Sequence, residues 1–158
     1  MKKRVTLILI FIFYIYSIFL FSSANPVLQW NSTLNAFMVR NCTELQNISL
    51  NLSGSYVLMN DIDCSDTINW NSGQGFEPVG NPSNNFVGSL DGQNYRIINL
   101  YIDRPSQDYV GLFGYVGVNG NIRNIGLINS RIRGNSLVGG IAGYTGYNVL
   151  ITNSYNTG

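Results

Sequence analysis

The chain has 158 residues, of which 45% are hydrophobic and 11% charged, a composition typical of a globular protein that buries a sizeable core. Residues 25–158 hold six basic and eight acidic residues, so they offer no basic stripe for nucleic acid. The chain contains no histidine, which excludes a Ser-His-Asp triad and zinc-protease chemistry within it.

Residues 1–24 have the three parts of a secretory signal peptide. Basic residues at positions 2–4 precede an uncharged apolar run over residues 5–21, and Ser22-Ser23-Ala24 supplies a small-residue cleavage site. An apolar run of about 17 residues also lies at the lower edge of what spans a bilayer, so a retained signal anchor is the alternative. In either case we expect the remainder to be secreted or held at the cell surface, with membrane contact only through residues 5–21 if they are not cleaved.

Residues 25–54 are predicted to form an N-terminal cap with one short helix. Asn41 stands three residues before Glu44, which is the spacing of a helix N-cap with its reciprocal glutamate. We expect the helix over about residues 43–50, with Leu45 and Ile48 facing inward and Gly54 ending it.

Cys42 and Cys64 are the two cysteines of the chain, and in an exported protein they are expected to form one disulfide. Closing a loop of this size would stabilise the fold by roughly 3 kcal/mol in the chain-entropy picture. Two free, buried thiols are the alternative.

The cap region is also rich in N-x-S/T sequons, which makes it a candidate for glycosylation if the host glycosylates exported chains. Such triplets also arise by chance in an asparagine-rich sequence, and the Asn41 sequon has the capping use given above. The candidate glycosylation sites are therefore Asn31, Asn47 and Asn51.

From residue 55 to residue 158 the pattern changes to short strands. Residues 56–63 fit a strand with Val57, Met59 and Ile62 as candidate core positions and a bend near Asn60. Residues 65–85 are predicted to be loop, because Gly, Pro, Asn and Ser recur throughout.

Asp61, Asp63 and Asp66 are the only cluster of acidic residues in the sequence. Alternation along a strand places Asp61 and Asp63 on one side, which could begin a calcium site or an acid/base pair. The alternative, favoured by the neighbouring disulfide and polar turn, is that these aspartates accept hydrogen bonds from loose backbone N–H groups. Calcium is thus the one cofactor considered, and the sequence predicts no catalytic residue.

After residue 85 the sequence repeats itself. Residues 97–99, 122–124 and 151–153 share the pattern Ile-x-Asn, and Gly-Tyr at 114–115 recurs 29 positions later. Units this short and glycine-rich must stack on their neighbours to bury an apolar face. We therefore predict a β-solenoid with parallel strands, with a β-sandwich as the alternative. At one corner we expect a hydrogen-bonded ladder of Asn99, Asn124 and Asn153.

Two groups of side chains are candidates for ligand binding. Arg123, Arg131 and Arg133 could form a basic patch for an anionic polymer, although a solvated outer face is the favoured alternative. The second group consists of tyrosines that could form an aromatic platform for sugar rings. Tyr115 and Tyr144 occupy equivalent repeat positions, and for these two we favour stacking on each other. The members of this group are Tyr109, Tyr115, Tyr144, Tyr147 and Tyr155.

The repeats carry a family resemblance. YVGLFGY at 109–115, NIRNIGL at 121–127 and VGGIAGY at 138–144, continuing to residue 158, resemble the GLUG repeat. YVLMNDIDC at 56–64, Trp70, FEPVG at 76–80 and FVGSLDGQNY at 86–95 resemble the segment that commonly precedes such repeats. The resemblance therefore extends over residues 42–158.

This resemblance implies an all-β, right-handed parallel β-helix of the kind found in secreted or cell-surface microbial proteins. These include adhesin-like proteins and the non-catalytic part of some immunoglobulin A-cleaving zinc proteases. Longer relatives would continue past residue 158, and a last coil without a neighbour would expose a strand edge.

We therefore expect a non-enzymatic surface module, adhesin-like or a structural spacer, that binds cell-surface glycans or proteins. The alternative is the accessory or catalytic part of a carbohydrate-active β-helix enzyme.

Overall fold

The structure is a computed structural model that describes residues 27–158. The predicted signal peptide, residues 1–24, lies outside the described residues. Among residues 27–158, no helix combines the length and the apolar character needed to cross a bilayer.

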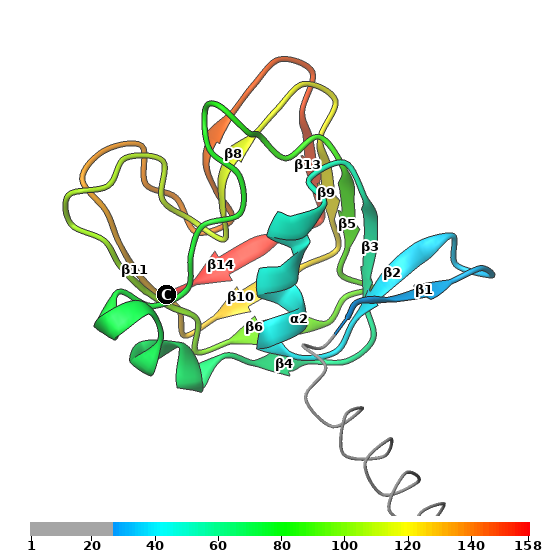
Figure 1. Cartoon of the computed structure of the whole chain (residues 1–158), viewed down its shortest axis with the longest axis horizontal. Helices are drawn as coiled ribbons and strands as arrows, with labels where there is room; N and C mark the ends of the chain where they lie inside the picture. Colours follow the sequence, from blue (N-terminus) through cyan, green and yellow to red (C-terminus); the bar gives the residue numbers. More distant parts are fainter. Residues whose placement is uncertain (1–26) are drawn as a thin grey trace, which may run out of the picture.

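The described chain starts with a cap and continues as stacked coils (Figure 1). The cap contains an antiparallel hairpin, β1 (Gln29–Asn31) and β2 (Ala36–Val39), followed by helix α2 (Cys42–Gln46) and the 3-10 helix η1 (Asn47–Leu50). The strands of the coils are β3 (Ser55–Leu58), β4 (Ile62–Asp63), β5 (Ser89–Asp91), β6 (Arg96–Ile98), β7 (Tyr101–Asp103), β8 (Phe113–Val116), β9 (Asn121–Arg123), β10 (Gly126–Ile128), β11 (Arg131–Arg133), β12 (Ala142–Thr145), β13 (Leu150–Thr152) and β14 (Tyr155–Thr157).

The strands stack in the pattern of a parallel β-helix. Strand order is β1-β2-β3-β5-β9-β13 in one sheet and β14-β10-β6-β4 in a second, and the pairs β11-β7 and β12-β8 form two more faces. The named strands of successive coils pair in parallel, as in Ile97 beside Leu127 and Ile122 beside Ile151. This pairing confirms the predicted parallel β-helix and excludes the β-sandwich, whose strands pair antiparallel.

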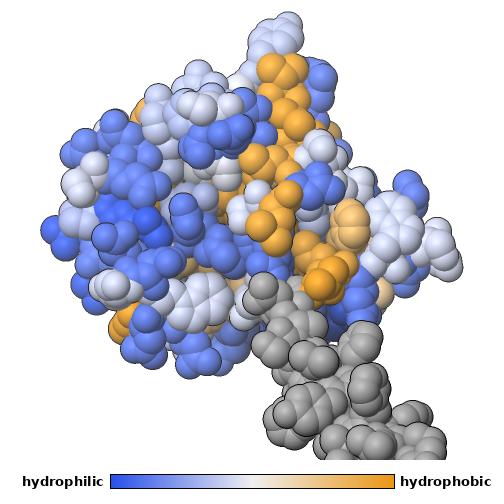
Figure 2. All heavy atoms as spheres, viewed as in Figure 1, coloured by the Kyte–Doolittle hydropathy of each residue, from blue (hydrophilic) through white to orange (hydrophobic). Residues whose placement is uncertain are grey.

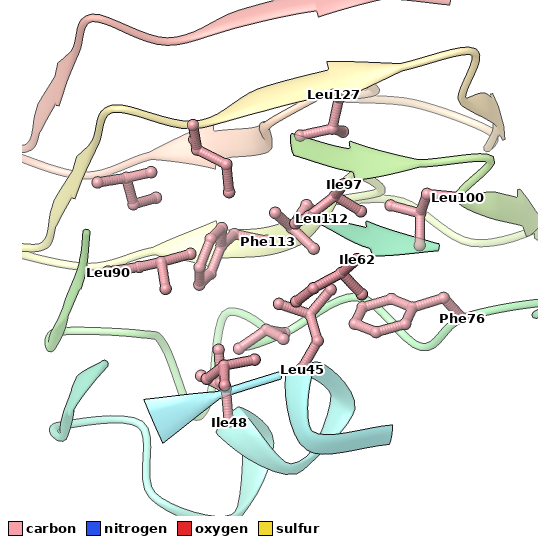
Figure 3. Packing of buried hydrophobic residues seen from close by; sticks show 14 of the residues in the cluster. Leu45, Ile48, Ile62, Phe76, Leu90, Ile97, Leu100, Leu112, Phe113 and Leu127 are labelled. Carbon is pink, nitrogen blue, oxygen red and sulfur yellow. The ribbon is translucent and has the colours of Figure 1, made fainter. Parts of the chain in front are cut away.

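The core consists of columns of side chains that run along the helix axis. Tyr56, Leu90 and Ile122 occupy one column of paired strands, and each is at most 2% exposed. A second column runs through Ile62, Ile97 and Leu127, all three labelled in Figure 3. Burial of each such side chain contributes about 1.5–3 kcal/mol, so the columns hold the coils together.

The strand predicted over residues 56–63 is two strands, β3 and β4, separated by the expected bend. The inward residues of β3 are Tyr56 and Leu58, whereas Met59 is only half-buried and Val57, although buried, is not part of the main core cluster. Val57 and Ile62 are thus buried as predicted, Met59 was wrong, and Tyr56 was missed. The Tyr56 hydroxyl donates to the Asn51 carbonyl at 2.5 Å, which satisfies it while the aromatic ring lies in the core.

The predicted helix is present over α2 and η1, and it covers the N-terminal end of the core (Figure 1). Asn41 caps it by accepting a hydrogen bond from the Glu44 amide at 2.8 Å. The Glu44 carboxylate, however, accepts from the Arg40 amide at 2.7 Å rather than from that of the cap residue. Leu45 and Ile48 are fully buried as predicted.

Two further expectations differ from the structure. η1 ends at Leu50, so Gly54 does not terminate the helix. Instead a Cβ at Gly54 would lie 2.7 Å from the Tyr56 hydroxyl, and glycine is needed there for close packing. The predicted loop over residues 65–85 contains two 3-10 helices, η2 (Ser65–Asn69) and η3 (Asn71–Gly73), and buries Phe76 and Val79 against the coils.

Candidate functional site

The predicted disulfide is present and ties the cap to the first coil. Cys42 begins α2 and Cys64 follows β4, and their sulfur atoms are bonded at 2.02 Å. Both residues are buried. The bridge therefore fixes the capping helix over the end of the core.

The predicted asparagine ladder is two ladders at different corners. Asn153 Nδ2 donates to Asn124 Oδ1 at 3.2 Å, so these two residues share a column as expected. Asn99 belongs to another corner, where Asn129 Nδ2 donates to Asn99 Oδ1 at 2.7 Å. All four residues have positive φ, a conformation that asparagine adopts more readily than most residues.

Two more corner pairs were missed in the sequence. Asn148 Nδ2 donates to Asn119 Oδ1 at 2.6 Å, and Asn135 Nδ2 donates to Asp108 Oδ1 at 2.8 Å. The 29-residue separation of Asn119 and Asn148 matches the repeat offset and was the signal that could have identified the first pair. In every pair the amide of the later coil donates to the earlier one.

An aspartate stands at the start of each of the two long ladders. Asn124 donates to Asp91 Oδ1 at 3.0 Å and Asn99 donates to Asp63 Oδ1 at 3.1 Å. Burial raises the pKa of Asp91, but hydrogen bonds from Asn124, the Gln93 amide and Arg123 outweigh it and hold that pKa below its usual range. A carboxylate suits this position because it only accepts hydrogen bonds and has no amide group left without an acceptor.

The structure does not assemble the three candidate calcium ligands. Asp61 is ion-paired with Arg96 and accepts from the Arg96 amide at 2.8 Å, and these bonds lower its pKa. Asp63 accepts from the Ser65 amide at 3.0 Å as well as from Asn99, and its pKa is lowered too. Asp66 is exposed in the first turn of η2. Within residues 27–158, no group of three or more His, Cys, Asp or Glu side chains could hold a metal ion.

The three candidate arginines are engaged one by one with the preceding coil. Arg123 pairs with Asp91 at 2.9 Å and Arg133 with Asp103 at 3.5 Å. The Arg131 guanidinium lies 5.8 Å from the ring centroid of Tyr101. These contacts favour a solvated outer face over a free basic patch, and exposed ion pairs of this kind add little stability.

Three of the five candidate tyrosines form a compact cluster, which we call the tyrosine cluster: Tyr109, Tyr115 and Tyr144. Tyr115 and Tyr144 stack with ring centroids 4.7 Å apart, as predicted for equivalent repeat positions. Tyr109 lies 5.8 Å from Tyr115 and 6.0 Å from Tyr144. Burial, followed by the two neighbouring rings, raises the pKa of Tyr115, and Tyr144 keeps 40% of its surface exposed.

The backbone around the tyrosine cluster is specialised. Tyr109 has a φ of 60°, which is rare for a bulky residue and indicates local strain that the surrounding structure holds. A Cβ at Gly143 would lie 2.7 Å from the Val110 amide nitrogen, so adjacent coils approach too closely here for any side chain. Tyr147 and Tyr155 have no ring contact with the cluster among the described aromatic pairs, and they are 83% and 50% exposed.

The sequon asparagines lie in different environments. Asn31 is half-buried and accepts hydrogen bonds from the Thr33 and Leu34 amides in the β1–β2 turn. Asn47 is half-buried at the end of α2, and Asn51 is exposed. Glycosylation at these positions remains a prediction.

The chain is similar to segments of two much longer proteins. It is 44% identical over 104 residues, 63% of the chain, to the Halomucin of Haloquadratum walsbyi. It is 34% identical over 114 residues, 69% of the chain, to a candidate Gly-rich membrane protein of Evansella cellulosilytica. These matches span 1% and 13% of the two relatives. No family model matches the chain.

A solved structure has the same fold. It is the crystal structure of a candidate immunoglobulin A1 protease from Bacteroides ovatus, 25% identical, with a TM-score of 0.56. The match covers 78% of this chain and 38% of that one. The β-solenoid is thus an architecture found in a larger protein as one part of it.

Proposed function

We propose that this chain is a non-catalytic, exported β-helix module of the GLUG-repeat type that presents an adhesive or spacing surface at the cell exterior. The names of its relatives, Halomucin and a Gly-rich membrane protein, are those of surface- or membrane-type proteins and support this proposal. Within residues 27–158 the clustered polar side chains are engaged between coils as ladders and ion pairs. Structural use of these groups favours a binding or spacing role over catalysis.

The tyrosine cluster is the observation that carries the binding part of the proposal. Its three rings come from two successive coils, and Tyr144 presents an exposed part of its surface. Aromatic rings with a polar hydroxyl contact the C–H faces and hydroxyls of sugars or the mixed surfaces of proteins. A glycan is therefore the ligand class we propose for the cluster.

A glycan array probed with the exported protein tests this function. We expect binding without release of reducing ends, and Tyr144→Ala should reduce it strongly. Tyr155→Ala removes another exposed tyrosine and should leave the binding unchanged. Equal loss in both variants, or cleavage of the bound polymers, would contradict the proposal.

A second candidate is an accessory part of a larger enzyme. This second role is favoured by the similarity to a candidate immunoglobulin A1 protease, because the match covers 38% of that larger protein. This role predicts that the exported protein binds immobilised immunoglobulin A1 without cleaving it. Absence of binding in a surface plasmon resonance experiment would remove this candidate.

A further inference from the structure

Two rings of the tyrosine cluster are placed side by side by the stacking of the coils. Tyr115 of β8 and Tyr144 of β12 are direct partners in a parallel pair of strands. Strands paired in this way lie about 4.8 Å apart, and the two ring centroids are 4.7 Å apart with their planes inclined by 41°. The phenol rings of two successive coils are therefore in contact.

The surrounding structure keeps the two rings together. A Cβ on Gly143, the residue before Tyr144, would lie 2.7 Å from the Val110 amide nitrogen, so the two coils are in direct backbone contact here. The Tyr109 ring packs on both members of the pair, 5.8 Å from Tyr115 and 6.0 Å from Tyr144. This packing restricts rotation of the two rings away from each other.

Phenol rings held in contact are joined by oxidation. A one-electron oxidant takes one electron and one proton from each tyrosine and leaves two phenoxyl radicals. A carbon next to the oxygen in one ring bonds to the same carbon in the other, and each carbon then passes its proton to its own ring oxygen, which restores both phenols. The product, dityrosine, has lost two hydrogen atoms, and hydrogen peroxide is reduced to water as it accepts them.

Tyr144 gives an oxidant access to the pair, because 40% of its surface is exposed. A radical on Tyr144 takes an electron and a proton from Tyr115 beside it, and Tyr144 is then oxidised a second time. Because the rings are already in contact, their coupling is a step within one molecule and proceeds faster than coupling between copies.

Other side chains compete little for this reaction. Both cysteines of the chain are in the disulfide, so no thiol reduces the radicals. Figure 2 shows exposed hydrophobic residues in a band that runs toward residue 27, and aliphatic side chains form no phenoxyl radical. Tyr147 and Tyr155 are 83% and 50% exposed, but neither contacts a second tyrosine ring among the described aromatic pairs. These two tyrosines therefore couple only between copies.

We propose that Tyr115 and Tyr144 are a modification site, at which a haem peroxidase and hydrogen peroxide join successive coils of the exported protein through a dityrosine bond. The bond fastens the coil of β12 and β13 to the coil before it. The coil of β12 and β13 is the less buried of the two: Leu150 and Ile151 are 53% and 37% exposed, whereas Ile122, the strand partner of Ile151, is fully buried. This inference rests on the ring geometry and does not depend on glycan binding.

Oxidation of the exported protein by a haem peroxidase and hydrogen peroxide tests the site. We expect a monomer that has lost two hydrogen atoms and has the fluorescence of dityrosine, with a yield that stays constant when the protein is diluted. Proteolysis and mass spectrometry should find the peptide of Tyr115 joined to that of Tyr144. Tyr144→Phe should remove this product, because phenylalanine forms no phenoxyl radical, and the matched control Tyr155→Phe should keep it.

Thermal unfolding tests whether the bond fastens the coils. A cross-link lowers the entropy of the unfolded chain, so oxidation should raise the melting temperature of the wild type and leave that of Tyr144→Phe unchanged. An equal yield of cross-linked monomer from Tyr144→Phe, or a link that maps to other tyrosines, would overturn the proposal. So would unmodified Tyr115 and Tyr144 under conditions in which the peroxidase couples free tyrosine. An unchanged melting temperature of the cross-linked wild type would overturn the fastening role.

Discussion

Asn124 links its own coil to the coils on both sides, because it donates to Asp91 Oδ1 at 3.0 Å and accepts from Asn153 Nδ2 at 3.2 Å. The amide of Asn124 is thus a donor toward the earlier coil and an acceptor toward the later one. This polarity gives the ladder a direction, which begins at a carboxylate.

Asn124→Asp is expected to destabilise the protein. The substitution replaces the donor with an acceptor and sets a second carboxylate against Asp91, at a loss of about 1–3 kcal/mol. Chemical denaturation of the exported protein measures it. Asn148→Asp is the matched control, because its partner Asn119 is an amide that can turn to donate instead. Equal losses in the two variants would contradict this account of the ladder.

Stability is expected to fall in acid because the pKa of Asp91 is lower in the folded protein than in the unfolded chain. A carboxylate whose pKa is lowered by folding stabilises the folded protein at pH values above its pKa in the unfolded chain, about 3.9. This stabilisation disappears as the pH falls through the pKa of the folded protein. Denaturation midpoints measured from pH 7 downward should therefore hold steady and then drop below about pH 4. Asp91→Asn should flatten this drop, and an unchanged acid limb would show that Asp91 is not responsible.

Removing the disulfide is expected to loosen the cap. The double variant Cys42→Ala/Cys64→Ala should lose roughly 3 kcal/mol of unfolding free energy, since the unfolded chain regains the freedom that the bridge removes. Thermal unfolding measures the loss. Alkylation of the unreduced wild type followed by intact-mass analysis should find no modified thiol, and full modification would contradict the bridge.

Close approach between coils makes Gly143 sensitive to substitution. Its Cβ would lie 2.7 Å from the Val110 amide nitrogen of the preceding coil and 2.6 Å from the Leu137 carbonyl oxygen of its own coil, so Gly143→Ala should cost about 1–3 kcal/mol through backbone displacement. At Gly146 the nearest atom would be 3.4 Å away, an ordinary contact, and Gly146→Ala should stay within about 1 kcal/mol of wild type. Thermal melts of the two variants compare them, and similar losses would refute the packing argument.

Much of the local structure could be predicted from the sequence. The helix cap at Asn41 and the inward positions of Leu45 and Ile48 depend on neighbours in the chain. The stacking of Tyr115 on Tyr144 depends on a constant repeat length. The two cysteines of an exported chain likewise have one intramolecular pairing. Such features follow from backbone geometry and repetition, which the order of residues records directly.

Other features depended on contacts between coils. Asn99 and Asn124 share the pattern Ile-x-Asn but are 25 residues apart, whereas the asparagine–asparagine partners in the two ladders are 29 and 30 residues apart. The same triplet occurs at two corners of a coil, so the pattern by itself does not assign the column. The inward phase of Tyr56 and the arginine–aspartate pairs were decided in the same way. Register and burial arise from packing over long range, and only the folded solenoid selects among locally equivalent patterns.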